Sequence, residues 1–99
     1  MLNKKEIAFF KTSLEARKEQ ITSNLITIRE NKLENENISL LEQQLEELGE
    51  IELALVRIKN TLYGTCEMCE EEIAIERLEV KIFAKYCMTC RKIIDKEYA

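Results

Sequence analysis

Two Cys-x-x-Cys pairs constrain this 99-residue chain more than any other feature of its sequence. They hold all four cysteines, Cys66 and Cys69 in the first pair and Cys87 and Cys90 in the second, with seventeen residues between the pairs. Each pair lets two thiolates reach one ion from a single tight turn, so two pairs supply the four soft ligands of a closed tetrahedral zinc site. We therefore predict that these four cysteines bind a structural Zn²⁺.

Other cysteine chemistry fits the same count. Two disulfides, an iron–sulfur cluster or a redox dithiol would each use four cysteines. Disulfides would require export, and residues 1–6 open no apolar run of the length that an export signal needs. Free cysteines at metal spacing are typical of a reducing compartment, so we expect a cytoplasmic protein.

Composition excludes several function classes. The net charge of −4 lacks the basic excess that phosphate binding demands, which argues against a zinc finger that reads DNA. The chain has no histidine, and four thiolates leave no open position on zinc, so we do not expect an enzyme. No stretch approaches the ~18 apolar residues of a membrane span.

Heptad spacing predicts a coiled-coil hairpin over residues 1–62. Asn3 and Glu6 form a capping-box pattern, and Leu2 can pack on Ile7 behind it. A first helix over about residues 3–29 and a second over about 38–62 follow from apolar residues seven apart. These residues are Ile7, Leu14, Ile21 and Ile28, then Leu41, Leu48, Leu55 and Leu62.

The hairpin should turn at residues 30–37, where the apolar period is lost and three asparagines occur. Antiparallel folding at this turn would leave it projecting into solvent as a tip, and the protein should be a monomer. A parallel dimer of one long helix is the alternative, which the turn argues against.

Residues 63–99 should form the metal module. It is too short to bury a large core, so zinc should supply much of its stability. Polar and apolar residues alternate in short stretches over residues 70–80, which predicts a minimal β-turn around the metal. A final helix should begin at Tyr86 and Cys87, and Ile94 and Tyr98 should pack back on the base of the hairpin. The predicted fold class is thus mainly α, a hairpin followed by a four-cysteine zinc finger and a C-terminal helix.

Several motifs around the cysteines resemble the DksA/TraR family, whose members are bacterial and phage transcription factors that bind RNA polymerase. The resemblance covers residues 50–91, and the spacing of its motifs makes it more specific than the cysteine pairs alone. The matching residues are Leu55, Arg57 and Ile58; Tyr63 to Glu67 with Cys69; Glu72 and Ile73; Arg77, Leu78 and Glu79; and Tyr86, Cys87 and Cys90.

The resemblance implies a regulator of transcription initiation that acts without chemistry and without sequence-specific DNA binding. The coiled coil would enter the secondary channel of RNA polymerase with its tip towards the active centre. The tip residues expected to contact this partner are Glu30, Asn31, Lys32, Glu34, Asn35 and Glu36. The resemblance also implies ppGpp, the alarmone of the stringent response, as an effector. Basic positions of the family fall here on Lys81 and Arg91, and a third falls on Glu50, which would repel phosphate.

Three positions depart from the family pattern. The family tip carries an Asp-x-x-Asp-x-Ala motif, whereas the only aspartate here is Asp95. Glu70 replaces a glycine that usually follows the second cysteine, so this turn must accept a non-glycine conformation or be looser. Ile82 replaces a usual proline. The alternative function is a non-enzymatic adaptor that dimerises through its heptads and docks a partner on the zinc finger.

Overall fold

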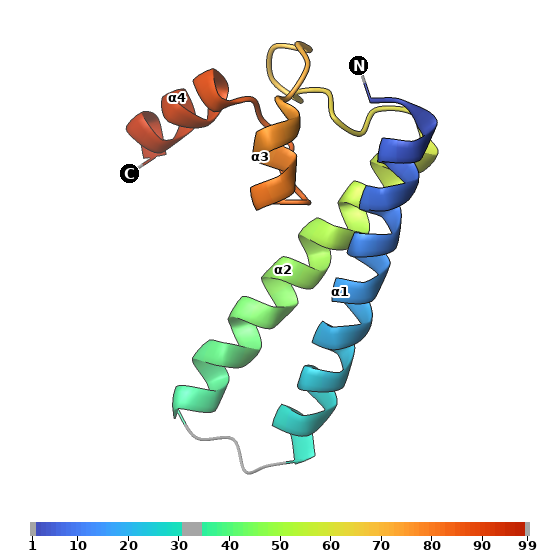
Figure 1. Cartoon of the computed structure of the whole chain (residues 1–99). Helices are drawn as coiled ribbons and strands as arrows, with labels where there is room; N and C mark the ends of the chain where they lie inside the picture. The colour runs from blue at the N-terminus through green and yellow to red at the C-terminus, as the bar shows by residue number, and fades with distance from the viewer. Residues whose placement is uncertain (1, 31–34, 99) are drawn as a thin grey trace.

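A long helical hairpin carries a small module of loops and short helices at one end (Figure 1). The computed structural model describes residues 2–30 and 35–98, without the side chains at 29, 30, 35–37, 97 and 98. The helices are α1 (Lys4–Glu30), α2 (Asn35–Lys59), α3 (Ile75–Val80) and α4 (Met88–Tyr98). α1 and α2 lie side by side and antiparallel, as the heptads predict.

The turn of the hairpin is shorter than the expected residues 30–37, because α1 continues to Glu30 and α2 already begins at Asn35. The helix propensity of these residues outweighs the loss of the heptad pattern here, since glutamate favours a helix and asparagine can begin one. Asn31, Lys32 and Glu34 lie outside the described residues, as do the side chains of Glu30, Asn35 and Glu36.

The start of α1 is the predicted capping box. The backbone N–H of Glu6 donates to Asn3 Oδ1 at 2.8 Å, and the N–H of Asn3 donates to Glu6 Oε1 at 3.0 Å. Two N–H groups that would lack a helical partner are therefore satisfied by the cap. This fixes where the chain enters the hairpin, next to the metal module.

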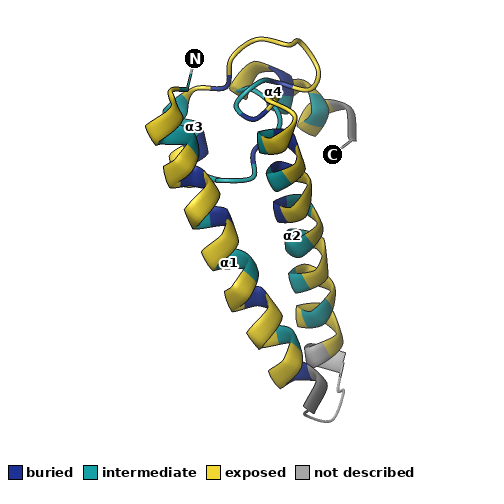
Figure 2. Ribbon diagram, turned by 90° about the vertical axis from the view of Figure 1, so that its right-hand side faces the viewer, coloured by how far each residue is buried: buried dark blue, intermediate teal, exposed yellow. Residues whose placement is uncertain are grey.

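The seam of the hairpin is apolar and follows the predicted positions of α1. Leu14 and Ile21 are fully buried, and Phe10 and Ile28 extend the same stripe. Figure 2 shows the buried positions facing inward along α1. On α2 the buried apolar positions are Ile51 and Ala54 together with half-buried neighbours, whereas Leu62 of the expected seam lies beyond the end of α2 and is about half exposed. The seam thus drifts around α2, because 3.6 residues per turn does not match a seven-residue repeat.

Thr61 ends α2 in a Schellman motif. The N–H of Leu62 donates to the carbonyl of Arg57 at 2.7 Å, and the N–H of Thr61 donates to the carbonyl of Ile58 at 3.2 Å. Thr61 takes φ = 60°, the left-handed conformation that glycine usually supplies at this position. The chain then turns into the metal module through Gly64.

Gly64 is required by both its conformation and its surroundings. Its φ is 84°, and a Cβ there would lie 2.8 Å from Leu2 Cδ1. Its carbonyl accepts from the N–H of Ile73 at 2.8 Å, beside an isolated antiparallel bridge between Thr65 and Glu72. The close approach lets Leu2, at the start of the chain, cover the first turn of the module.

Two expectations for residues 63–99 are wrong. Residues 75–80, expected as part of a β-turn, form the short helix α3, which buries Leu78 fully in the core. The final helix begins at Met88, and α4 extends away from the hairpin (Figure 1). Ile94 is not among the described apolar residues that pack against the core. The side chain of Tyr98 is outside the described residues. Among described residues, no helix is long and apolar enough to cross a membrane.

Candidate metal centre

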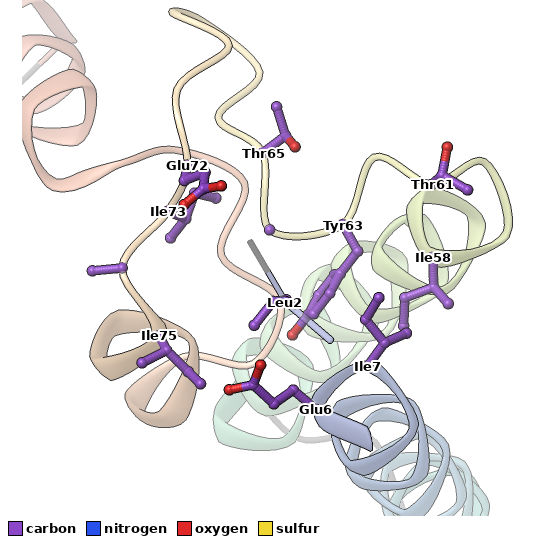
Figure 3. A pocket seen from close by; sticks show the side chains of 12 residues that line it. Leu2, Glu6, Ile7, Ile58, Thr61, Tyr63, Thr65, Glu72, Ile73 and Ile75 are labelled. Carbon is purple, nitrogen blue, oxygen red and sulfur yellow. The ribbon is translucent and has the colours of Figure 1, made fainter. Parts of the chain in front are cut away.

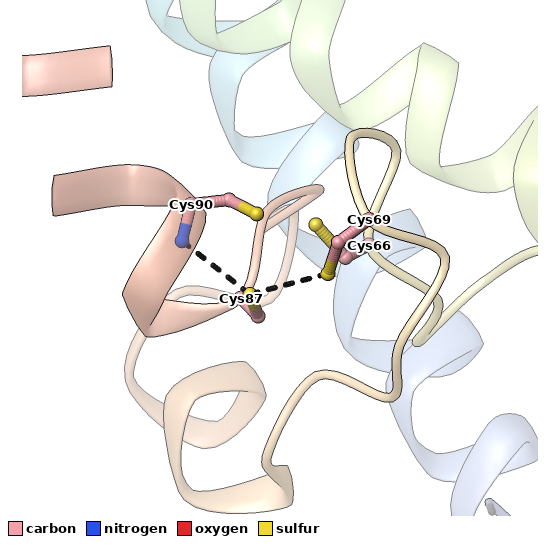
Figure 4. A group of neighbouring side chains, drawn as sticks. All are labelled: Cys66, Cys69, Cys87 and Cys90. Atoms are coloured by element: carbon pink, nitrogen blue, oxygen red, sulfur yellow. Dashed lines mark hydrogen bonds between the residues drawn. The ribbon is translucent and has the colours of Figure 1, made fainter. Parts of the chain in front are cut away.

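The fold brings the four cysteine sulfurs together. The sulfur atoms of Cys66, Cys69, Cys87 and Cys90 all lie within 4.8 Å of one another. Figure 4 shows the first pair on the loop after α2 and the second pair at the start of α4. Cys66 and Cys90 are buried and Cys69 is exposed, so the cluster lies at the edge of the module.

This arrangement fits one tetrahedral metal ion. Four Zn–S bonds of about 2.3 Å place neighbouring sulfurs about 3.8 Å apart. The sulfurs of Cys69 and Cys87 are 3.7 Å apart, and all four cysteines are free of disulfides. A cluster with several irons would hold its cysteines farther apart, because they bind different irons. The donor set therefore fits Zn²⁺ in a closed shell of four thiolates.

The first cysteine pair sits in a tight turn held by its own backbone. The N–H of Glu70 donates to the carbonyl of Cys66 at 3.0 Å, and the N–H of Cys66 donates to the carbonyl of Glu71 at 2.8 Å. Glu70 takes φ = 64°, the left-handed conformation that glycine favours, so the expectation of a non-glycine conformation at this position is wrong. At the second pair, the N–H of Cys90 donates to the sulfur of Cys87, with 3.4 Å between the nitrogen and the sulfur.

The thiols differ in pKa before a metal binds. Burial raises the pKa of Cys66, but backbone hydrogen bonds, chiefly with Cys69 and Cys87, outweigh burial and lower the pKa to about 6. Burial and the neighbouring thiols raise the pKa of Cys90 to about 12. The turns thus stabilise one thiolate, and a divalent cation would have to displace the proton from Cys90.

Two arginines hold the loops that carry the cysteines, and the sequence does not reveal this role. Arg57, near the end of α2, donates to the carbonyls of Leu62 and Thr65. Arg77 of α3 donates through Nε to the carbonyl of Tyr86 at 3.0 Å. Both belong to motifs of the family resemblance, which marks them but gives no physical reason for them.

Tyr63 joins the hairpin to the module. Its ring packs on Phe10 of α1, with centroids 5.8 Å apart, and its hydroxyl donates to the carbonyl of Ile82 at 2.7 Å. Burial raises the pKa of Tyr63, so its hydroxyl stays protonated and keeps donating. Ile82, where the family usually has proline, supplies this acceptor carbonyl.

A groove of about 620 Å³ lies beside this junction, between the start of α1, the end of α2 and residues 64–75 (Figure 3). Its apolar wall includes Leu2, Ile7 and Ile58, and its charged lining residues are Glu6 and Glu72. Without a lining cation, this groove does not suit a phosphate ligand.

The two basic residues singled out from the sequence lie on different elements. Lys81 follows the last residue of α3, with its ammonium 5.3 Å from the centre of the Phe83 ring. Arg91 lies on α4 and pairs with Asp95, Nε to Oδ1, at 3.1 Å. Both side chains remain partly accessible, and Asp95 competes with any anion for Arg91.

A helical hairpin joined to a four-cysteine centre defines the class of protein, a small mainly α-helical zinc-finger protein. Residues 62–96 match the sequence model of the prokaryotic dksA/traR C4-type zinc finger. The chain is 35% identical over 72 residues to an uncharacterized protein of Aquifex aeolicus, covering 73% of this chain and 47% of that protein. It is 35% identical over 48 residues to the RNA polymerase-binding transcription factor DksA of Buchnera aphidicola, covering 48% of this chain and 32% of that protein. The matches thus span less than half of each curated relative.

Solved structures share the fold. Transcription factor DksA2 from Pseudomonas aeruginosa superposes with a TM-score of 0.83 at 20% identity, over 97% of this chain and 88% of that one. The RNA polymerase binding protein and transcriptional regulator Dks from Chlamydia trachomatis gives a TM-score of 0.66 at 27% identity, over 98% and 95%. The zinc-finger region, residues 62–96, thus matches the DksA/TraR family, and the chain as a whole has a DksA-like fold.

Proposed function

We propose that this chain regulates transcription initiation by binding bacterial RNA polymerase and inserting its hairpin tip into the secondary channel. The observation that carries the proposal is the joint match, a family-type zinc finger on a hairpin whose fold agrees with DksA2 over 97% of the chain. The chain would act by contact, as a non-enzymatic protein without sequence-specific DNA binding.

The two parts of the chain would have separate roles. Residues 63–99 would hold structural Zn²⁺ through Cys66, Cys69, Cys87 and Cys90, and would rest on the rim of the channel. Residues 1–62 would supply the reach, because 27 residues of α1 at 1.5 Å each span about 40 Å. The longest dimension of the molecule is 45 Å, so the hairpin accounts for most of it.

The tip would work with glutamates in place of the family's aspartates. We propose that Glu30, Asn31, Lys32, Glu34, Asn35 and Glu36 form the partner-contacting tip. A variant with Glu30, Glu34 and Glu36 changed to alanine tests the role of charge. It should still bind core polymerase within about threefold, because the zinc module and helices are unchanged, but should lose its effect on initiation in a purified transcription reaction. An unaltered effect on initiation would show that the glutamates do not replace the aspartates.

We propose ppGpp as an effector that acts through Lys81 and Arg91 together with polymerase. The half-buried Glu50 lies on α2 at the third family position and opposes a phosphate ligand. Glu50→Lys should therefore strengthen the response to ppGpp in the transcription reaction, and Lys81→Ala with Arg91→Ala should abolish it. If the double alanine variant responds like the unaltered chain, ppGpp does not act through these residues.

Exposed apolar residues on α2 favour a second candidate, an adaptor that dimerises through the hairpin. Leu45 and Val56 are half exposed, and Leu53 is also exposed. Sedimentation velocity over a wide concentration range separates the candidates. A constant monomer mass supports the polymerase regulator, whereas a mass that doubles and returns to monomer in Leu45→Glu supports the adaptor.

A further inference from the structure

Arg57 holds the peptide group that precedes the first cysteine of the first pair. It donates through Nη2 to the carbonyl of Thr65, and the nitrogen of that same peptide belongs to Cys66. The N–H of Cys66 in turn closes the metal-binding turn by donating to Glu71. Arg57 thereby fixes the plane of the peptide from which the Cys66 side chain leaves the backbone.

The second cysteine pair is held in the same way by a different helix. Arg77 of α3 donates through Nε to the carbonyl of Tyr86, the residue immediately before Cys87. Its Nη1 lies 3.9 Å from the sulfur of Met88, immediately after Cys87. Each pair therefore has one arginine, from a preceding helix, bound to the carbonyl just before its first cysteine.

The charges of these arginines suit a metal centre. One Zn²⁺ with four thiolates carries a net charge of −2, and the two guanidinium groups lie one peptide group away from its ligands. Arg57 is only 9% exposed, and its carboxylate partner Glu67, at 3.4 Å, is itself half exposed. A buried cation needs compensating charge nearby, which the filled site would add.

We propose that Arg57 and Arg77 are paired positioning residues of the zinc site. Each orients the first cysteine of one pair through the preceding carbonyl, and together they offset the charge of the four thiolates. This inference rests on the proposed zinc site. It also couples that site to the end of α2, because Arg57 binds the carbonyl of Leu62 just beyond the helix and that of Thr65 within the module.

The test measures zinc affinity by competition with a coloured chelator in Arg57→Met, Arg77→Met and the two lysine variants. Each methionine variant should lose 10- to 100-fold in zinc affinity, the usual effect of removing a group that orients metal ligands. Lysine should recover part of the loss, because it restores the charge without the fixed geometry of the guanidinium fork. The Co²⁺-loaded variants should show shifted sulfur-to-metal charge-transfer bands, which a general loss of stability does not produce.

Arg17→Met is the matched control. Arg17 pairs with Glu47 across the hairpin, so its removal makes the same charge change without touching the metal module. Its zinc affinity should equal that of the unaltered chain within about twofold. If Arg57→Met loses helical circular dichroism, Arg77→Met decides the matter, because Arg77 lies on the short helix α3 and not on either helix of the hairpin.

The outcomes separate the inference from the site on which it rests. One zinc per unaltered chain with weakened binding in Arg77→Met supports both. One zinc per chain with affinity unchanged in both methionine variants overturns the positioning role and leaves the zinc site standing. An unaltered chain that binds no zinc overturns both.

Discussion

Glu70 carries backbone strain that its position in the metal turn imposes. Its φ of 64° costs a non-glycine residue about 1 kcal/mol or more, and its side chain is exposed. Glu70→Gly should stabilise the zinc-loaded protein by about 0.5–1 kcal/mol, after the greater chain entropy of unfolded glycine is subtracted. The urea midpoint measures this change. Glu71→Gly is the control, since Glu71 is also exposed but has no positive φ, and a gain of equal size there would contradict the explanation.

Thr61 presents the same problem at the end of α2, with a branched side chain that suits φ = 60° even less. Thr61→Gly should stabilise the protein by about 1 kcal/mol because glycine is the usual residue at this position of a Schellman motif. Thr61→Ala keeps the strained conformation and should give no such gain. Thermal unfolding of the three proteins side by side checks the order.

At the same scale, spacing predicts the cysteine cluster but not the residues that hold it. Two cysteines with two residues between them must share a turn, so the sequence around each pair is enough to predict that their sulfurs come together. Arg57 and Arg77 act on main-chain carbonyls 8 and 9 residues further along the chain. A carbonyl has no side-chain signature, so only the folded chain reveals which one each arginine reaches.

Among the elements, α2 has a weak point at Gly49. Glycine in a helix interior costs up to about 1 kcal/mol relative to alanine, and a Cβ at Gly49 would meet no atom within 4 Å. Gly49→Ala should therefore raise the urea midpoint by a corresponding amount. Gly64→Ala should lower the urea midpoint, because φ at this position is positive and Leu2 blocks the added Cβ. A destabilising Gly49→Ala would mean that this face of α2 is covered in solution.

The elements also differ in how far the sequence specifies them. α1 and α2 follow from long heptads and a capping box, which need no tertiary information. α3 has only six residues, too few to show a helical period, and it forms because burial of Leu78 against the core overrides local preference. The direction of α4 depends on how the turn at Cys87 leaves the module, and helical spacing of Ile94 and Tyr98 does not encode that direction.

For the whole molecule, metal removal should unfold one end before the other. The core around the cysteines is thin, and much of its order would depend on the zinc. With a chelator, hydrogen exchange should accelerate throughout residues 62–90, while amides near Leu14, Ile21 and Ile51 stay slower because their seam does not include the metal. Acid should act in the same direction, since protons compete with zinc for the thiolates. Equal acceleration over the whole chain would show that the hairpin does not fold without the module.

The most direct test of the polymerase proposal is a photo-crosslinking measurement with the zinc-loaded protein and core RNA polymerase. A photoreactive amino acid at position 32 in the tip should crosslink to the walls of the secondary channel, and an excess of unlabelled protein should prevent it. The same amino acid at exposed Lys5, at the opposite end of the hairpin, should not reach the channel interior. Specific binding with position 32 in the channel is the predicted result. No saturable binding, or crosslinks from position 32 only to the outer surface of polymerase, would contradict the proposed function.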